Sequence, residues 1–470
     1  MAMRAAGLVV SVATLVACTE PVPHGRREIS DRLRDLPGVT VEEWSPPAGF
    51  DAPAGYRFFD LLVTVPIDHD DPAAGTFELY AALMHHDVDA PLVVYTSGYD
   101  AGWRRFLTEP ARIVGGNQVS LEHRFYGRSR PPVVPWSRLR VDQAAADEHL
   151  VLELLRTIYD GPRIATGGSK GGETALFHHR RYPGDYDGVV AYVVPVTTGL
   201  PDLRYDGVLD RIGLPACRAR LRAIGRRMLQ HRDALAFRAG DVSSFTIAGA
   251  DRVIETSVVE LEFAFWMTRG VADCPDVPDP ATAGADDLWA FLDMTSAPAA
   301  YSDEALVRYA TPYLYQGHVE LGYPVWNHGH LDDLMRYRYE DWSPYLPAGQ
   351  PLGYDPAVAL DLAAWLADVA DHVLLIQGEW DPWAAGAPTI HPGRDAYQLW
   401  VPRGSHWSAG LHSLGEPDAT VAREALRRWA RLAPAKDEHV VPKVAPPPAP
   451  MATRGPEDDR LLRRRGWGVE

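Results

Sequence analysis

The sequence lacks an excess of positive charge, a zinc-binding motif and an N-terminal apolar segment long enough to cross a membrane. The formal net charge of −17 argues against nucleic acid as the main partner, because phosphate binding requires a basic surface. No His-Glu-X-X-His motif occurs and the 17 histidines show no clustered ligand spacing, so we expect no metal and no other cofactor. The apolar run at residues 8–17 is too short to span a bilayer and fits a signal peptide.

The N-terminus resembles the lipobox of bacterial lipoproteins. Leu15-Val16-Ala17 precedes Cys18, which would carry lipid as the first mature residue and anchor the protein without a spanning helix. The alternative is a plain signal peptide with a chance cysteine. Export also bears on the other cysteines, because two thiols can pair in an oxidising compartment. We therefore predict a Cys217–Cys274 disulfide, the alternative being two buried thiols.

Strand and helix patterns alternate along most of the chain. Residues 58–85 have the alternation of a hairpin, and short apolar runs beginning near 91, 116, 163, 189 and 372 are typical of buried parallel strands. Helical spacing at 142–159 and from about 171 separates several of these runs. The pattern predicts an α/β fold with a mainly parallel sheet. Residues 200–350 contain helical patterns instead, which predicts a helical insertion in the middle of the chain.

These patterns divide the chain into six parts. We expect a lipoprotein signal peptide at 1–17, a linker at 18–50, the first part of an α/β core at 51–199, a helical cap at 200–350, the second part of the core at 351–433, and a Pro-rich, disordered tail at 434–470.

A serine stands between two glycine pairs where a strand pattern turns into a helix pattern. Gly167-Gly168-Ser169-Lys170-Gly171 fits Gly-X-Ser-X-Gly, the nucleophile elbow of α/β-hydrolases. Glycine is needed there because a Cβ would clash where strand and helix pack closely. The helix N-terminus lies behind the serine, so we expect the backbone N–H of Lys170 to face a developing oxyanion.

A nucleophilic serine needs a base and an acid that orients the base. In this fold they follow in the order Ser, Asp or Glu, His, on loops after later strands. Asp381 comes just after one apolar strand pattern and His406 just after the next, which predicts the triad Ser169–Asp381–His406. Asp395 and Glu379 are alternatives for the acid, and His391 and His412 for the base.

The second oxyanion donor is expected from the loop after the strand pattern at residues 91–98. We assign it to the backbone N–H of Tyr99, with Gly98 or a side chain as alternatives.

Several of these motifs together resemble a known family. TGGSKGGETALFHHRRYP (166–183), SLEHRFYGRSRPP (120–132), YTSGYD, GEWDPW and GSHW are similar to segments of the secreted bacterial prolyl tri/tetrapeptidyl aminopeptidases. These serine exopeptidases are related to lysosomal Pro-X carboxypeptidase and dipeptidyl peptidase II. The resemblance covers roughly residues 50–435, but not the Pro-rich tail.

The resemblance implies an α/β-hydrolase with the triad already chosen, a helical cap over the cleft, and peptide substrates with a free N-terminus and proline near the scissile bond. Recognition of a substrate amine needs a buried carboxylate. YQGHVELGYP (315–324) resembles a stretch of the wider family, which makes Glu320 the candidate, with Glu260 and Glu262 as alternatives.

The sequence therefore predicts an exported serine exopeptidase that releases Pro-containing tri- or tetrapeptides from the free N-terminus of peptides. One alternative is an esterase or lipase, since the triad chemistry is identical and only the cleft differs. Another is a lipoprotein that binds peptides without cleaving them, although a binding protein does not need a complete triad.

Overall fold

The computed structural model describes residues 27–47, 49–101, 105–391 and 394–434. The predicted signal peptide, Cys18 and nearly all of the predicted Pro-rich tail lie outside the described residues. None of the helices in the described ranges is long and apolar enough to cross a membrane.

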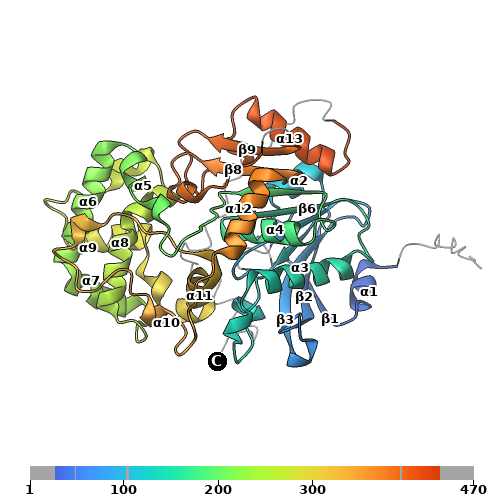
Figure 1. Ribbon diagram of the computed structural model, residues 1–470, viewed down its shortest axis with the longest axis horizontal. Coiled ribbons are helices and arrows are strands. Elements are labelled where there is room, and N and C mark those ends of the chain that lie inside the picture. The colour runs from blue at the N-terminus through green and yellow to red at the C-terminus, as the bar shows by residue number, and fades with distance from the viewer. Residues whose placement is uncertain (1–26, 48, 102–104, 392–393, 435–470) are drawn as a thin grey trace, which may run out of the picture.

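One mixed sheet organises the described part of the chain (Figure 1). Its nine strands there run in the order β1-β2-β3-β5-β4-β6-β7-β8-β9, with β1, β2 and β3 antiparallel and the strands from β5 to β9 parallel to one another. The strands are β1 (Val39–Trp44), β2 (Arg57–Pro66), β3 (Thr76–His85), β4 (Leu92–Thr96), β5 (Asn117–Leu121), β6 (Arg163–Gly168), β7 (Gly188–Tyr192), β8 (Val373–Gly378) and β9 (Ala396–Val401).

Helices cover both faces of this sheet, which explains the unbroken apolar runs of its central strands. On β4, Val94 joins a core with helices α3 (Val141–Leu155), α4 (Lys170–Arg181) and α12 (Ala357–Asp368). Its neighbour Val93 joins the opposite core, with helices α2 (Glu109–Val114) and α13 (Asp418–Trp429). Successive side chains of a strand point to opposite faces, so a strand covered on both sides must be apolar at every position.

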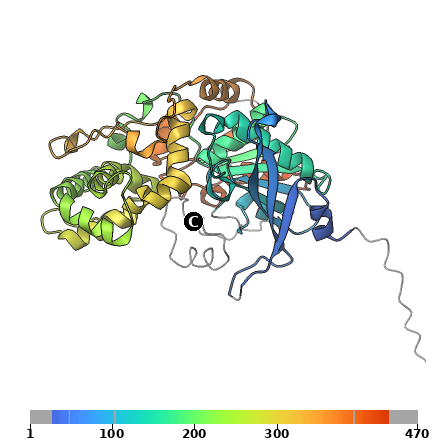
Figure 2. The same cartoon turned by 90° about the horizontal axis from the view of Figure 1, so that it is seen from below.

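A helical region enters between β7 and β8 and has a core of its own. Figures 1 and 2 show it beside the sheet rather than in either of its helical layers. Its helices are α5 (Val208–Arg211), α6 (Pro215–Gln230), α7 (Arg232–Val242), α8 (Ala250–Thr268), α9 (Ala285–Thr295), α10 (Asp303–Ala305) and α11 (Thr311–Gln316), with a π-helical turn at Gly317–Leu321. The predicted α/β-hydrolase fold with an inserted helical cap is confirmed.

The prediction of a linker at 18–50 is wrong for its described part. Helix α1 (Ile29–Arg34) and edge strand β1 lie there, and β1 pairs with β2 in antiparallel register. Only one side of an edge strand is paired, and β1 has no buried side chain, so its sequence VTVEEW carries little of the apolar pattern that indicates a strand.

Cys217 of α6 and Cys274 of the turn Val271–Asp276 form a disulfide in the structure, with their Cα atoms 5.6 Å apart. The two residues are 57 positions apart, so the bond joins two ends of a long segment of the helical region.

Replacing both Cys217 and Cys274 by alanine should lower the free energy of unfolding by about 2–4 kcal/mol, because the cross-link restricts the unfolded chain. Differential scanning calorimetry of the wild-type and doubly substituted proteins measures this. In denaturant, iodoacetamide should label these two cysteines only after reduction. Labelling without reductant, with equal thermal stability of the two proteins, would contradict the bond.

Candidate active site

Ser169 occupies a strained turn between β6 and α4. Its φ of 53° and ψ of −130° lie outside the regions that non-glycine residues usually adopt, which costs about 1–3 kcal/mol. Close packing surrounds the turn, since a Cβ on Gly167 would lie 2.5 Å from the carbonyl carbon of Gly171. The two glycines of the motif are therefore required by the approach of strand and helix. The backbone holds the serine at the N-terminus of α4.

His406 and Asp381 meet on the loops after β9 and β8. His406 Nδ1 lies 2.6 Å from Asp381 Oδ2, and the carboxylate is buried. The other oxygen of Asp381 accepts the backbone N–H of Trp383 at 3.0 Å, which fixes the carboxylate at the start of a 3₁₀ turn. With Nδ1 bound to the acid, Nε2 of His406 is left to act on a nucleophile or a leaving group.

The four alternative acids and bases do not line the pocket that contains Ser169 and His406. Asp395 pairs with Arg428, His412 pairs with Glu109, Glu379 accepts the backbone N–H of Arg403, and His391 is exposed.

Tyr99 contacts the serine through its side chain rather than its backbone. The Tyr99 N–H, predicted as an oxyanion donor, donates to Ser97 Oγ at 3.2 Å within its own loop. Burial raises the pKa of the Tyr99 phenol and the Ser169 side chain opposes that rise, so the two side chains lie close together. The positive φ of Gly98, 72°, turns the loop at this point.

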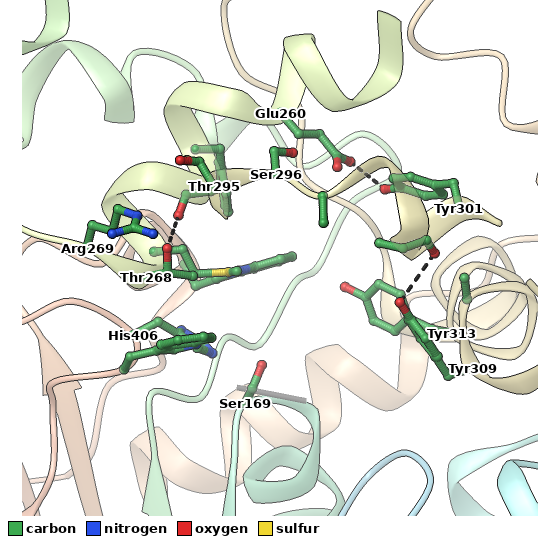
Figure 3. A pocket seen from close by; sticks show the side chains of 18 of the residues that line it. Ser169, Glu260, Thr268, Arg269, Thr295, Ser296, Tyr301, Tyr309, Tyr313 and His406 are labelled. Atoms are coloured by element: carbon green, nitrogen blue, oxygen red, sulfur yellow. Dashed lines mark hydrogen bonds between the residues drawn. The ribbon is translucent and has the colours of Figure 1, made fainter. Parts of the chain in front are cut away.

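Ser169, His406 and Tyr99 line a pocket of about 410 Å³ between the sheet and the helical region. Figure 3 shows Ser169 and His406 on one side of the pocket, with Glu260 and Tyr301 across from them. The walls are rich in aromatic side chains: Tyr99, Phe263, Tyr301, Tyr309, Tyr313, Tyr323, Trp326, Trp383 and Trp407. Such a cavity suits a ligand with apolar groups and a few polar ends.

Glu260 is a carboxylate in this pocket without a cationic partner among the described residues. It accepts hydrogen bonds from Tyr301 at 2.8 Å and Tyr339 at 3.3 Å. Burial raises its pKa to about 7, and the two tyrosine hydroxyls oppose that rise. It comes from α8, where residues 260, 263, 264, 267 and 268 all line the pocket at helical spacing. Glu262 lies on another face of α8 and pairs with Arg222 at 2.8 Å.

Glu320, predicted to bind the substrate N-terminus, lies outside the pocket that contains Ser169. Its side chain is buried and does not line the pocket. It accepts the backbone N–H of Val141 at 2.9 Å, at the start of α3, and pairs with Arg140 at 3.1 Å. A helix N-terminus attracts an anion, so Glu320 stabilises the contact between the π-helical turn and α3. The resemblance of residues 315–324 to the family motif identified a buried carboxylate but not the direction in which it points.

One group of described side chains has the spacing of a metal site, namely His149, His178 and Asp185. Their ligand atoms are hydrogen bonded to each other at 2.7–2.8 Å, and Asp185 also pairs with Arg156. The Asp185 carboxylate is already paired with the Arg156 guanidinium and hydrogen bonded to histidine ring nitrogens. These contacts favour a structural hydrogen-bond network over a metal centre. None of these residues lines the pocket.

The chain is similar to known peptidases over most of its length. The family model described as PS-10 peptidase S37 matches residues 23–465. The prolyl tri/tetrapeptidyl aminopeptidase of Streptomyces mobaraensis is 35% identical over 448 residues, 92% of each chain. The prolyl carboxy peptidase like protein 5 of Caenorhabditis elegans is 27% identical over 188 residues, 34% of this chain and 36% of that protein.

Among solved structures, the proline iminopeptidase of Mycobacterium smegmatis is similar with a TM-score of 0.40 and 16% identity, over 79% of this chain and 99% of that one. The family match and the Streptomyces relative both span most of the sequence, which confirms the predicted relationship. The chain therefore belongs to the peptidase S37 family.

Proposed function

We propose that the protein is an exported serine exopeptidase that releases Pro-containing tri- or tetrapeptides from the free N-terminus of peptides. The observation that carries this proposal is one pocket with Ser169 and the Asp381-bound His406 on one side and the carboxylate of Glu260 on the other. The Streptomyces mobaraensis relative bears the name of such an activity.

In the proposed reaction, Ser169 Oγ attacks the carbonyl carbon of the scissile bond while His406 Nε2 takes the hydroxyl proton. The tetrahedral intermediate collapses, the C–N bond breaks and His406 gives the proton to the leaving amine. Water then attacks the acyl-enzyme with His406 again as base, which releases the N-terminal peptide and restores Ser169. Asp381 orients the imidazole and stabilises its charged form.

Two donors serve the oxyanion in this proposal. One is the backbone N–H of Lys170, the first residue of α4, where the helix dipole favours negative charge. The other is the hydroxyl of Tyr99, whose side chain lies close to that of Ser169 and lines the pocket.

Glu260 binds the substrate ammonium in this proposal. A carboxylate across the pocket from the nucleophile limits how many residues fit between the N-terminus and the cleaved bond, which produces an exopeptidase. The aromatic walls suit a proline ring, which has no N–H to satisfy once acylated and packs well against flat apolar groups.

The same residues weigh against the two alternatives. An esterase or lipase acting on apolar esters gains nothing from a buried carboxylate across the pocket, which costs desolvation free energy. A non-catalytic binding protein does not need a hydrogen-bonded His406–Asp381 pair beside a strained serine.

Export and lipidation of Cys18 are also part of the proposal. Their support is the N-terminal sequence pattern, together with a Cys217–Cys274 disulfide of the kind that persists in oxidising compartments. We propose that residues 200–350 act as the cap that restricts access to the pocket, between core segments at 51–199 and 351–433.

Ser169→Ala should abolish hydrolysis of a free Ala-Ala-Pro p-nitroanilide, and Asp381→Asn should lower kcat by about 10⁴-fold because the imidazole loses its orienting anion. The panel includes the N-acetylated peptide, a Pro anilide and a short-chain ester. We expect cleavage of the free tripeptide alone. Ester cleavage alone would make the protein an esterase, and silence on every substrate would leave a binding protein.

Glu260→Gln should raise KM for the free tripeptide by about 10- to 100-fold, with kcat much less affected, because a charge-assisted hydrogen bond is lost. The matched control is Glu262→Gln, the same change two residues along α8, which should leave KM unchanged. A KM that is equal for wild type and Glu260→Gln would remove Glu260 from amine recognition.

The pH dependence gives a second test of Glu260. Its pKa of about 7 means that it is an anion only above that pH, whereas a peptide α-amino group loses its proton above about pH 8. The ratio of the KM of Glu260→Gln to the KM of the wild type should therefore be largest between these pH values. It should shrink as the pH falls below 7. Comparing both proteins on one substrate cancels every pH effect that the two share, and a ratio independent of pH would contradict the assignment.

Cys18→Ser should prevent incorporation of labelled palmitate and move the protein from the membrane fraction to the medium. Metabolic labelling and fractionation of expressing cells test this. An unlabelled wild-type protein that is found in the medium would instead support a plain signal peptide.

A further inference from the structure

The chain uses lysine very sparingly, and one lysine is buried beside the nucleophile. Only three lysines occur, at positions 170, 436 and 443, and the last two lie outside the described residues. Lys170 directly follows Ser169 and is 3% exposed. Burying an ammonium group costs several kcal/mol unless it is well paired. The position of Lys170 therefore calls for a specific role.

The Lys170 side chain reaches the loop that follows β4. Its Nζ donates a hydrogen bond to the Gly98 carbonyl oxygen at 2.5 Å. The same Nζ lies 5.4 Å from the ring centroid of Tyr99 and 5.1 Å from that of Tyr126, so two aromatic rings face the cation.

Several ionisable groups act on the charge of Lys170. The carboxylates of Glu173, Glu320 and Glu148 favour the ammonium form, whereas burial lowers its pKa to about 7. Burial lowers the pKa of the His123 ring, and the nearby charge of Lys170 lowers it further. The ammonium thus has aromatic and acidic neighbours but makes its one short hydrogen bond to Gly98.

The loop that Lys170 holds has little freedom to move by itself. A Cβ on Gly98 would lie 2.7 Å from the carbonyl carbon of Lys170, so loop and elbow are already in backbone contact. The Tyr99 carbonyl accepts the N–H of His123 at 2.9 Å, and the Tyr99 phenol lies close to the Ser169 side chain in the pocket. A shift of the Gly98 carbonyl would therefore move the Tyr99 phenol away from the serine.

We propose that the Lys170 side chain is a positioning residue, which holds the Gly98–Tyr99 loop so that the Tyr99 hydroxyl stays on the oxyanion side of Ser169. The inference rests on the proposed function, in which Tyr99 is an oxyanion donor. It assigns Lys170 two tasks: its backbone N–H faces the oxyanion, and its side chain sets the place of the second donor.

The geometry also explains lysine at a position where the rest of the fold uses arginine. A compact ammonium reaches one carbonyl oxygen between two rings, whereas a guanidinium is a wide planar fork with five donors. Arginine would leave donors unpaired in a buried space or push the loop outward. Lys170→Arg is therefore not a conservative change here.

A double-mutant cycle tests whether Lys170 acts through Tyr99. Tyr99→Phe should lower kcat on the free tripeptide anilide by about 100-fold, as loss of an oxyanion donor does. Lys170→Met should lower kcat by about 10- to 100-fold with KM nearly unchanged. In the Tyr99→Phe background, Lys170→Met should lower kcat by less than about 3-fold, because the hydroxyl that it positions is already gone.

Affinity for a transition-state analogue separates positioning from a general loss of structure. Lys170→Met should weaken inhibition by Ala-Ala-prolinal by the same factor as kcat/KM, because the aldehyde forms an oxyanion on Ser169. Affinity for the product Ala-Ala-Pro should stay unchanged. If Lys170→Met does not fold, Lys170→Arg is the second variant. It should weaken inhibition and lower kcat/KM by a common but smaller factor, again with unchanged affinity for the product.

The control is Arg232→Met, which removes another buried cation. Arg232 pairs with Glu255 at 2.6 Å in the helical region and does not line the pocket. We expect it to lower the melting temperature but not kcat.

Two outcomes would overturn the inference, and they are distinguishable. In the first outcome, Tyr99→Phe lowers kcat, and Lys170→Met lowers kcat by the same factor in the Tyr99→Phe background as in the wild type. Lys170 then does not act through Tyr99, and the proposed function stands. If Tyr99→Phe retains wild-type kcat, the assignment of Tyr99 as oxyanion donor fails, and the role of Lys170 fails with it.

Discussion

The site depends on the very close approach of three backbone segments at Ser169. The loop after β4, the end of β6 and the first turn of α4 leave no room for a Cβ at Gly98, Gly167 or Gly171. The strained φ of Ser169 persists because backbone hydrogen bonds hold the residue on both sides. Its N–H donates to Tyr192 of the neighbouring strand at 2.8 Å, and its carbonyl accepts the N–H of Glu173 in α4 at 2.9 Å.

The same constraint links the sheet to the chemistry of the pocket. Parallel strands bring their carboxyl ends to one edge, so the loops after β4, β6, β8 and β9 meet there with Tyr99, Ser169, Asp381 and His406. The loops of the sheet carry the residues of the predicted triad, but the sheet does not enclose them. The helical region adds the opposite wall, and one face of α8 contributes both its apolar residues and Glu260.

The separate contributions of the sheet and the helical region explain how much of the site could be predicted from the sequence. Ser169, Asp381 and His406 were selected because each follows an apolar strand pattern, and the fold fixes where such loops lie. No comparable rule governs an inserted helical region. Glu260 and Glu320 are both buried glutamates on helical turns, and only packing decides that the first faces the pocket and the second α3. The sequence also could not show that the Tyr99 side chain turns toward Ser169, since the direction of a side chain after a glycine turn has no sequence pattern.

The buried charged residues give the strongest reason to infer that the two walls of the pocket serve one function. Asp100, which lines the same pocket, is paired with Arg308, whereas Glu260 has only tyrosine hydroxyls as partners among the described residues. A buried carboxylate without a cation destabilises a fold, and an apolar residue of similar volume would stabilise this one. Lys170 has the opposite charge: it is a buried ammonium in a chain that otherwise favours arginine. Stability alone selects against both groups, so their presence fits the roles proposed for them: Glu260 as the partner of a substrate ammonium and Lys170 as the residue that positions the Gly98–Tyr99 loop.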